Sequence, residues 1–175
     1  MKTFFRFFLL VFFFFYILKT SVFAESSYVL PYPSSMPGSF AYRFHLVYEN
    51  ISKYWYFGSF GQFEYNLKLA DKYLVEAKTL FDYKQYLLAV ESLGKSNYYF
   101  RKSLPSLKKA EKEGKSISQK RLVLKEAAQK HVETLEEMQI GSPEIFNWQP
   151  EKASPTMLNI KGTIENAINV RKNDL

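Results

Sequence analysis

The apolar residues between positions 63 and 107 constrain the fold of this chain more than any other feature. They recur at steps of four and three in two runs, separated by a break at residues 82–84. The first run consists of Phe63, Leu67, Ala70, Leu74, Ala77 and Phe81, and the second of Tyr86, Val90, Leu93, Asn97, Phe100, Leu104 and Leu107. Such spacing places one apolar stripe on each of two helices, and the short break requires them to run antiparallel. The sequence therefore predicts an antiparallel helical hairpin as the core of the fold, over residues 60–113.

Further helices are predicted on both sides of this hairpin. A first helix over residues 39–57 would begin at the N-cap Ser39. Its stripe is formed by Phe40, Phe44, Val47, Ile51 and Tyr54. A helix over residues 117–140 has its own stripe of Leu124, Ala128, His131, Leu135 and Met138. After a proline-containing loop, Ser154 and Pro155 would start a fifth helix with Met157 on its inner side. We therefore predict an all-α bundle of four to five helices, forming a single domain over residues 39–175.

Three sites carry the spacing of a capping box, in which two side chains satisfy backbone N–H groups at a helix start. They are Ser59 with Gln62, Asp82 with Gln85, and Ser116 with Gln119. These pairs predict where the second, third and fourth helices begin.

Residues 1–24 have the order of a signal peptide: a charged start, an apolar run over residues 7–18, and small side chains before Glu25. The run is shorter than the roughly 20 residues that a bilayer-spanning helix needs, so we predict cleavage between Ala24 and Glu25. The alternative is an uncleaved membrane anchor. Removing the segment would lower the net charge from +7 to +4. The protein is accordingly expected to be exported, as a secreted, periplasmic or envelope-associated chain.

Residues 25–38 contain three prolines within seven positions, which excludes helix and favours an extended strap. We expect Leu30, Tyr32 and Met36 to fix this strap against the helices. The alternative function is recognition of a partner.

The chain offers few residues for catalysis. It has no cysteine, which excludes disulfides and thiol chemistry, and its two histidines lack the surrounding ligands of a metal site. His131 is expected at the edge of its helical stripe. Nucleophile elbows and phosphate-binding loops are missing, so we predict a protein without enzymatic activity or cofactor. A carboxylate-dependent hydrolase that uses Glu133 or Glu136 with His131 is kept as an alternative.

Aromatic and basic residues are concentrated in the second half of the hairpin. The candidate surface comprises Tyr98, Tyr99, Arg101, Lys102, Lys108, Lys109 and Lys112. Such a combination suits a partner protein or an anionic envelope polymer, with no specific nucleic acid expected. The alternative is a solvated helix surface. Asn97 would either fix the register of the packed helices or hold its amide in solvent.

Three segments resemble a family of exported, uncharacterised bacterial helical proteins classed as a domain of unknown function. They are Leu30-Pro31-Tyr32-Pro33 with Pro37 and Tyr42, residues 64–74 around Leu-Ala-Asp-Lys, and residues 86–93. The resemblance implies an exported helical domain, sometimes attached to a membrane, and it brings no catalytic residues. The resulting expectation is a structural or interaction module of the cell envelope, with a membrane-tethered sensor as the alternative.

Overall fold

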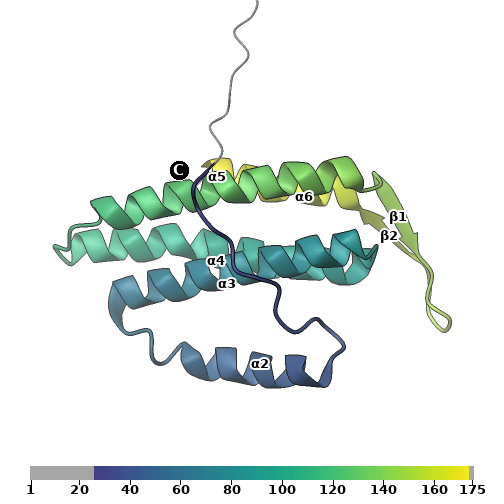
Figure 1. Ribbon diagram of the computed structural model, residues 1–175, viewed down its shortest axis with the longest axis horizontal. Helices are drawn as coiled ribbons and strands as arrows, with labels where there is room; N and C mark the ends of the chain where they lie inside the picture. Colours follow the sequence, from purple (N-terminus) through teal and green to yellow (C-terminus); the bar gives the residue numbers. More distant parts are fainter. Residues whose placement is uncertain (1–25, 174–175) are drawn as a thin grey trace, which may run out of the picture.

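A computed structural model describes residues 26–173 (Figure 1). Its elements are α2 (Phe40–Ser52), α3 (Gly58–Asp82), α4 (Tyr86–Lys112), α5 (Ser118–Gly141), β1 (Ile145–Trp148), β2 (Thr156–Asn159) and α6 (Ile160–Asn173). The predicted all-α bundle is confirmed, with one small sheet added. The predicted signal peptide and its cleavage site at Ala24 and Glu25 lie outside the described residues.

The predicted hairpin is present as α3 and α4, which pack side by side along their length. Their stripes face each other, and Leu74 and Leu93 have no exposed surface. The tight connection is made possible by Lys84, whose φ of 58° lies in the left-handed region that turns of this kind require.

Helices α5 and α6 cover one face of the hairpin, and the core between them consists of two apolar clusters. One contains Leu74, Leu93, Leu135 and Ile164, and the other contains Phe63, Phe100, Leu107 and Leu124. Between the two clusters, each helix contributes polar side chains at one level. These are Asp71 of α3, Ser96 and Asn97 of α4, His131 of α5 and Arg171 of α6, which we call the polar layer.

Helix α2 lies on the opposite face of the hairpin (Figure 1). The stripe predicted for this helix points away from the body: Phe40 is 79% exposed and Phe44 63%. Tyr42 and the carboxylate of Glu49 point inward instead, because both form hydrogen bonds with side chains of the hairpin. The expectation that an apolar stripe marks a buried side is wrong for this helix.

The predicted start of the fifth helix is also wrong. Residues Thr156–Asn159 form β2, which pairs antiparallel with β1 so that Ile145 lies opposite Asn159 and Trp148 opposite Thr156. Branched and aromatic side chains favour this pairing over helix. Helix α6 begins only after Asn159, whose Oδ1 accepts from the backbone N–H of Gly162 at 2.8 Å.

Of the predicted caps, only Ser39 is confirmed, since its hydroxyl accepts from the backbone N–H of Tyr42 at 3.2 Å. The three capping boxes are absent, because no side chain caps α3, α4 or α5. Ser59 donates to Glu113 Oε2 at 2.7 Å, and Gln62 donates to the carbonyl of Tyr56 at 2.8 Å. Both side chains thus bond to groups in other parts of the chain.

The strap runs from α5 across the bundle to α2 (Figure 1). As predicted, Leu30 and Met36 pack against the apolar core. Tyr32 does not, since it is 96% exposed, and Tyr28 is the strap tyrosine that reaches the bundle.

Within residues 26–173, no helix combines the length and hydropathy that crossing a bilayer requires.

Candidate functional site

A groove runs between α2 and α4 above α3. It consists of two pockets of about 460 Å³ each, which share Asn50, Tyr98 and Tyr99. We call it the tyrosine groove. Its lining residues are Leu46, Glu49, Asn50, Lys53, Tyr54, Gln62, Tyr65, Asn66, Tyr73, Glu91, Gly94, Lys95, Tyr98, Tyr99 and Lys102.

Tyrosine rings form the central wall of this groove. Tyr99 stacks on Tyr73 with ring centres 5.8 Å apart and an angle of 5° between the planes. Tyr65 and Tyr98 each meet Tyr99 edge to face, at 6.2 Å and 5.1 Å. Because Tyr65 and Tyr73 are spaced by about two helical turns, α3 presents both on the same side. The wall is therefore a continuous aromatic surface from two helices.

Lysine ammonium groups stand at both ends of the aromatic wall. Lys102 donates to the hydroxyl of Tyr98, and its Nζ lies 4.0 Å from the centre of that ring. At the other end, Lys95 Nζ lies 5.6 Å from the centre of the Tyr73 ring and 3.3 Å from Glu91 Oε1. These cations leave the groove suited to ligands that combine flat apolar faces with negative charge.

Glu49, one of the two acidic residues that line the groove, is held by partners on α3. Tyr73 donates to Glu49 Oε2 at 2.7 Å, and Lys72 forms an ion pair with Glu49 Oε1. Tyr65 donates to the Glu49 backbone carbonyl at 3.1 Å. These bonds hold α2 in place over the hairpin.

A second carboxylate lies deeper under α2. Glu76 is only 3% exposed, and its Oε1 accepts from Tyr42 at 3.1 Å and from Ser92 at 2.6 Å. Its Oε2 has no hydrogen-bond donor and lies 4.0 Å from Lys72 Nζ. Lys72 is therefore the cation that balances both acids.

Burial favours the protonated form of three groove tyrosines, Tyr65, Tyr73 and Tyr99. It raises the pKa of Tyr65 to about 12. It also raises the pKa of Tyr73, where the hydrogen bond to Glu49 acts in the same direction, and the pKa of Tyr99. Near neutral pH these phenols can donate hydrogen bonds, whereas a role as base or nucleophile would require ionisation.

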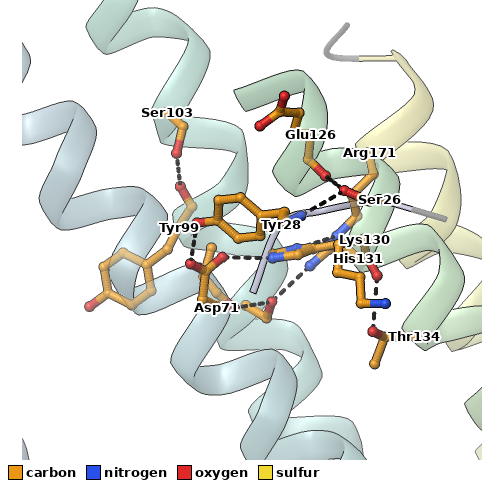
Figure 2. Close-up of polar contacts among 12 residues, drawn as sticks. Ser26, Tyr28, Asp71, Tyr99, Ser103, Glu126, Lys130, His131, Thr134 and Arg171 are labelled. Atoms are coloured by element: carbon orange, nitrogen blue, oxygen red, sulfur yellow. Dashed lines mark hydrogen bonds and ion pairs between the residues drawn. The ribbon is translucent and has the colours of Figure 1, made fainter. Parts of the chain in front are cut away.

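On the other face of the hairpin, the polar layer joins three ionisable side chains (Figure 2). His131 Nε2 lies 2.7 Å from Asp71 Oδ1, and Arg171 Nε donates to His131 Nδ1 at 3.3 Å. Since Nδ1 accepts, the ring proton is on Nε2 and points to Asp71. Tyr28 of the strap donates to the second oxygen of Asp71 at 2.7 Å.

Arg171 has no exposed surface and is surrounded by further acceptors. Its Nη2 donates to Ser96 Oγ at 2.7 Å, and its Nη1 donates to Asn97 and to the backbone carbonyl of Ala167. Its guanidinium also stands 5.0 Å from the centre of the Phe100 ring. A buried charge at this depth is tolerated only with such a set of partners.

The pairing of Asp71 with His131 has the geometry of a catalytic dyad, but both ring nitrogens are engaged and the ring has no exposed surface. Burial lowers the pKa of His131, and the charge of Arg171 acts in the same direction. The layer therefore serves to join the helices and the strap.

The structure brings some of the predicted surface residues together and separates others. Tyr98, Tyr99 and Lys102 line the tyrosine groove. Arg101, Lys108, Lys109 and Lys112 are exposed and are not among the residues that line it. The predicted surface is thus divided between a groove and a solvated stretch of α4.

Two individual predictions need correction. His131 is fully buried, not at the edge of its stripe, because Asp71 and Arg171 supply partners inside the bundle. Asn97 is 9% exposed and accepts from Arg171, so the alternative of an amide in solvent is wrong.

The acids considered for a hydrolase are engaged elsewhere. Glu133 accepts from the backbone N–H of Ser26 at 2.8 Å and from Lys130 at 3.0 Å. Glu136 lies 3.8 Å from Lys172 and is half exposed. Within residues 26–173, no group of three or more His, Asp or Glu side chains is arranged to hold a metal ion.

Sequence reasoning missed Tyr65, Tyr73 and Glu49 in the groove, and Arg171 in the polar layer. The spacing of the two tyrosines was a usable signal, since it places both on one helical face. Arg171 gave no such signal, because its side-chain partners His131, Asn97 and Ser96 lie 40, 74 and 75 positions away. Comparisons of the chain with protein-family models, curated proteins and solved structures find no match.

Proposed function

We propose that this protein is an exported, non-enzymatic interaction module of the cell envelope that binds an extended anionic polymer in the tyrosine groove. The observation that carries this proposal is the continuous wall formed by Tyr65, Tyr73, Tyr98 and Tyr99 with lysines at both ends. Aromatic faces offer contact area at little cost in conformational entropy, and lysines attract negative groups.

The shape of the groove favours a chain-like ligand over a small compact one. Its two pockets are neighbours, since Asn50, Tyr98 and Tyr99 line both, and each opens to the surface. Sugar rings have apolar faces that pack on aromatic rings, and carboxylate or phosphate groups on such a polymer would meet Lys95 and Lys102. An acidic polysaccharide fits both requirements.

The chemistry of the groove supports binding without catalysis. The phenols of Tyr65 and Tyr73 stay protonated because burial raises their pKa values, and the carboxylate of Glu49 is paired with Lys72 and Tyr73. These groups hold a ligand through hydrogen bonds and ring contacts.

Calorimetric titration of the chain with polygalacturonate, using neutral dextran for comparison, tests the proposal. Replacing Tyr98 with Ala and Lys102 with Gln removes one ring and one cation from the groove, so affinity for polygalacturonate should fall about tenfold or more. The matched control is Lys108→Gln with Lys109→Gln, which should change affinity less than about twofold after correction for net charge.

The opposite pattern would contradict the proposal. If the Tyr98 and Lys102 replacements leave binding unchanged while the Lys108 and Lys109 replacements abolish it, the ligand is held by the solvated basic stretch. Equal affinity for dextran would show that the cations do not select the ligand.

A further inference from the structure

Helix α2 and the turn after it expose a row of large apolar side chains. Phe40, Phe44, Tyr48, Ile51, Trp55 and Phe57 are each at least half exposed, and we call them the α2 aromatic face. Phe40 and Phe44 meet edge to face at 5.1 Å, and Tyr48 and Trp55 at 6.2 Å. The rings thus form two pairs along the exposed side of α2 and its following turn.

Within residues 26–173, most of the surface of these side chains is exposed to solvent rather than packed in the core. Helix α2 attaches to the hairpin through its opposite side, where Glu49 and Tyr42 bond to Tyr73, Lys72 and Glu76. Single exposed apolar residues are common on proteins, but a row of this kind usually marks a binding surface.

The charges around the face have one sign. Between positions 39 and 63 the chain carries two cationic residues, Arg43 and Lys53, and both are exposed. The single acid in that stretch is Glu49, which turns inward and is paired. Arg43 therefore lies on α2 beside the aromatic rings, and Lys53 lies at the end of the helix, where it also lines the tyrosine groove.

We propose that the α2 aromatic face docks onto the surface of a bilayer that contains anionic lipids, with α2 parallel to the membrane plane. Amphipathic helices bind in this way when aromatic and aliphatic side chains enter the interface and cations meet the headgroups. A second copy of the chain is a poorer partner, because two such faces would bring Arg43 and Lys53 of both copies together.

This site is separate from the tyrosine groove, which opens beside α2 toward α4. It also differs from the N-terminal anchor considered above, because Ser26 lies against α5 on the far side of the bundle. Membrane contact through α2 would place the body of the bundle away from the lipid.

The fluorescence of Trp55 can report whether α2 contacts a bilayer. It contains two tryptophans, so Trp148→Phe leaves Trp55 as the only one. We would mix the full chain bearing this change with vesicles of phosphatidylcholine, with or without phosphatidylglycerol, and with brominated acyl chains as quenchers. Trp55 emission should shift to the blue and be quenched with phosphatidylglycerol present, and less so at high salt. This readout reports on α2 whether or not residues 1–24 also enter the bilayer.

Replacing Phe44 and Ile51 with Ser should reduce the apparent affinity for these vesicles about tenfold or more, since each loses apolar area that the bilayer would cover. The matched control is Leu122→Ser with Ile140→Ser, two exposed positions on α5 that should leave quenching unchanged. All four positions are exposed, so thermal unfolding should confirm an intact fold in both variants.

Absence of Trp55 quenching in every vesicle would overturn the proposal, as would equal loss in the control variant. A dimer that forms in sedimentation experiments and is broken by Phe44→Ser with Ile51→Ser, without quenching, would instead assign the face to a second copy. Loss of polymer binding in the groove variants should leave the quenching unchanged, so the two proposals fail separately.

Discussion

The two faces of the α3–α4 hairpin are covered in opposite ways. Toward α5 and α6, apolar side chains pack inward and the polar layer around Arg171 is enclosed between them. Toward α2, the polar groups of Glu49 and Tyr42 face inward while Phe40 and Phe44 face water. An apolar stripe therefore sets the orientation of a helix only where the opposing surface is also apolar. Where the hairpin presents Lys72, Tyr73 and Glu76, a helix that brings hydrogen-bonding partners turns its polar side inward.

The greatest loss of stability is expected when the polar layer between the hairpin and helices α5 and α6 is disrupted. Arg171→Met removes the buried cation that donates to His131 and leaves Asn97 and Ser96 without this donor, so the free energy of unfolding should fall by about 3–5 kcal/mol. Denaturant unfolding followed by circular dichroism measures this. The control, Lys172→Met, alters a neighbouring exposed ion pair and should cost less than about 1 kcal/mol. Similar losses in the two variants would show that the layer contributes no more than a surface pair.

A smaller effect on the free energy of unfolding is expected from protonation of His131, on the same side of the hairpin. Burial lowers the pKa of His131 below its ordinary value of 6.5. Just below pH 6.5, His131 is therefore protonated in the unfolded chain but stays neutral in the folded chain. The stability is present above pH 6.5 and is lost as the pH falls toward the folded-state pKa, by up to about 1.4 kcal/mol per pH unit.

Unfolding measured between pH 7 and pH 5 checks this slope. His131→Asn should reduce it. If the slope is the same in this variant as in the original chain, titration of His131 is not its cause.

The smallest effect is expected on the α2 side. Glu49→Gln removes the charge that pairs with Lys72, which should cost about 1 kcal/mol and loosen α2 alone, since few core contacts depend on it. Faster hydrogen exchange in α2, with unchanged exchange in α3, is the expected result. The control Glu91→Gln changes an exposed acid paired with Lys95 and should affect neither helix. Exchange that rises throughout the bundle would show that α2 is part of the cooperative core.

Several parts of the fold could be predicted from the sequence because they depend on local spacing. The stripes of α3 and α4 and the break at Lys84 defined the hairpin, and the prolines defined the strap. The β-hairpin was missed because Ile145 and Thr156 pair with residues across a turn, which helical spacing does not detect. The direction of α2 was missed for a related reason: Glu49 meets Tyr73, 24 positions away.

The candidate sites, too, could be predicted only where their residues are close in sequence. Tyr98, Tyr99 and Lys102 were predicted because they are close in sequence, but Tyr65 and Tyr73 complete the groove only through packing of α3 on α4. His131 and Asp71 are 60 residues apart, so no local pattern could join them. The predicted cleavage between Ala24 and Glu25 stays a prediction.

The contacts of Asp71 have a consequence for how this protein matures. Its two oxygens are met by Tyr28, which precedes every described helix, and by His131, which is fixed in turn by Arg171 of α6. A chain that emerges from the ribosome can therefore pair α3 with α4 early. It cannot complete the set of contacts around Asp71 and His131 until synthesis has delivered Arg171.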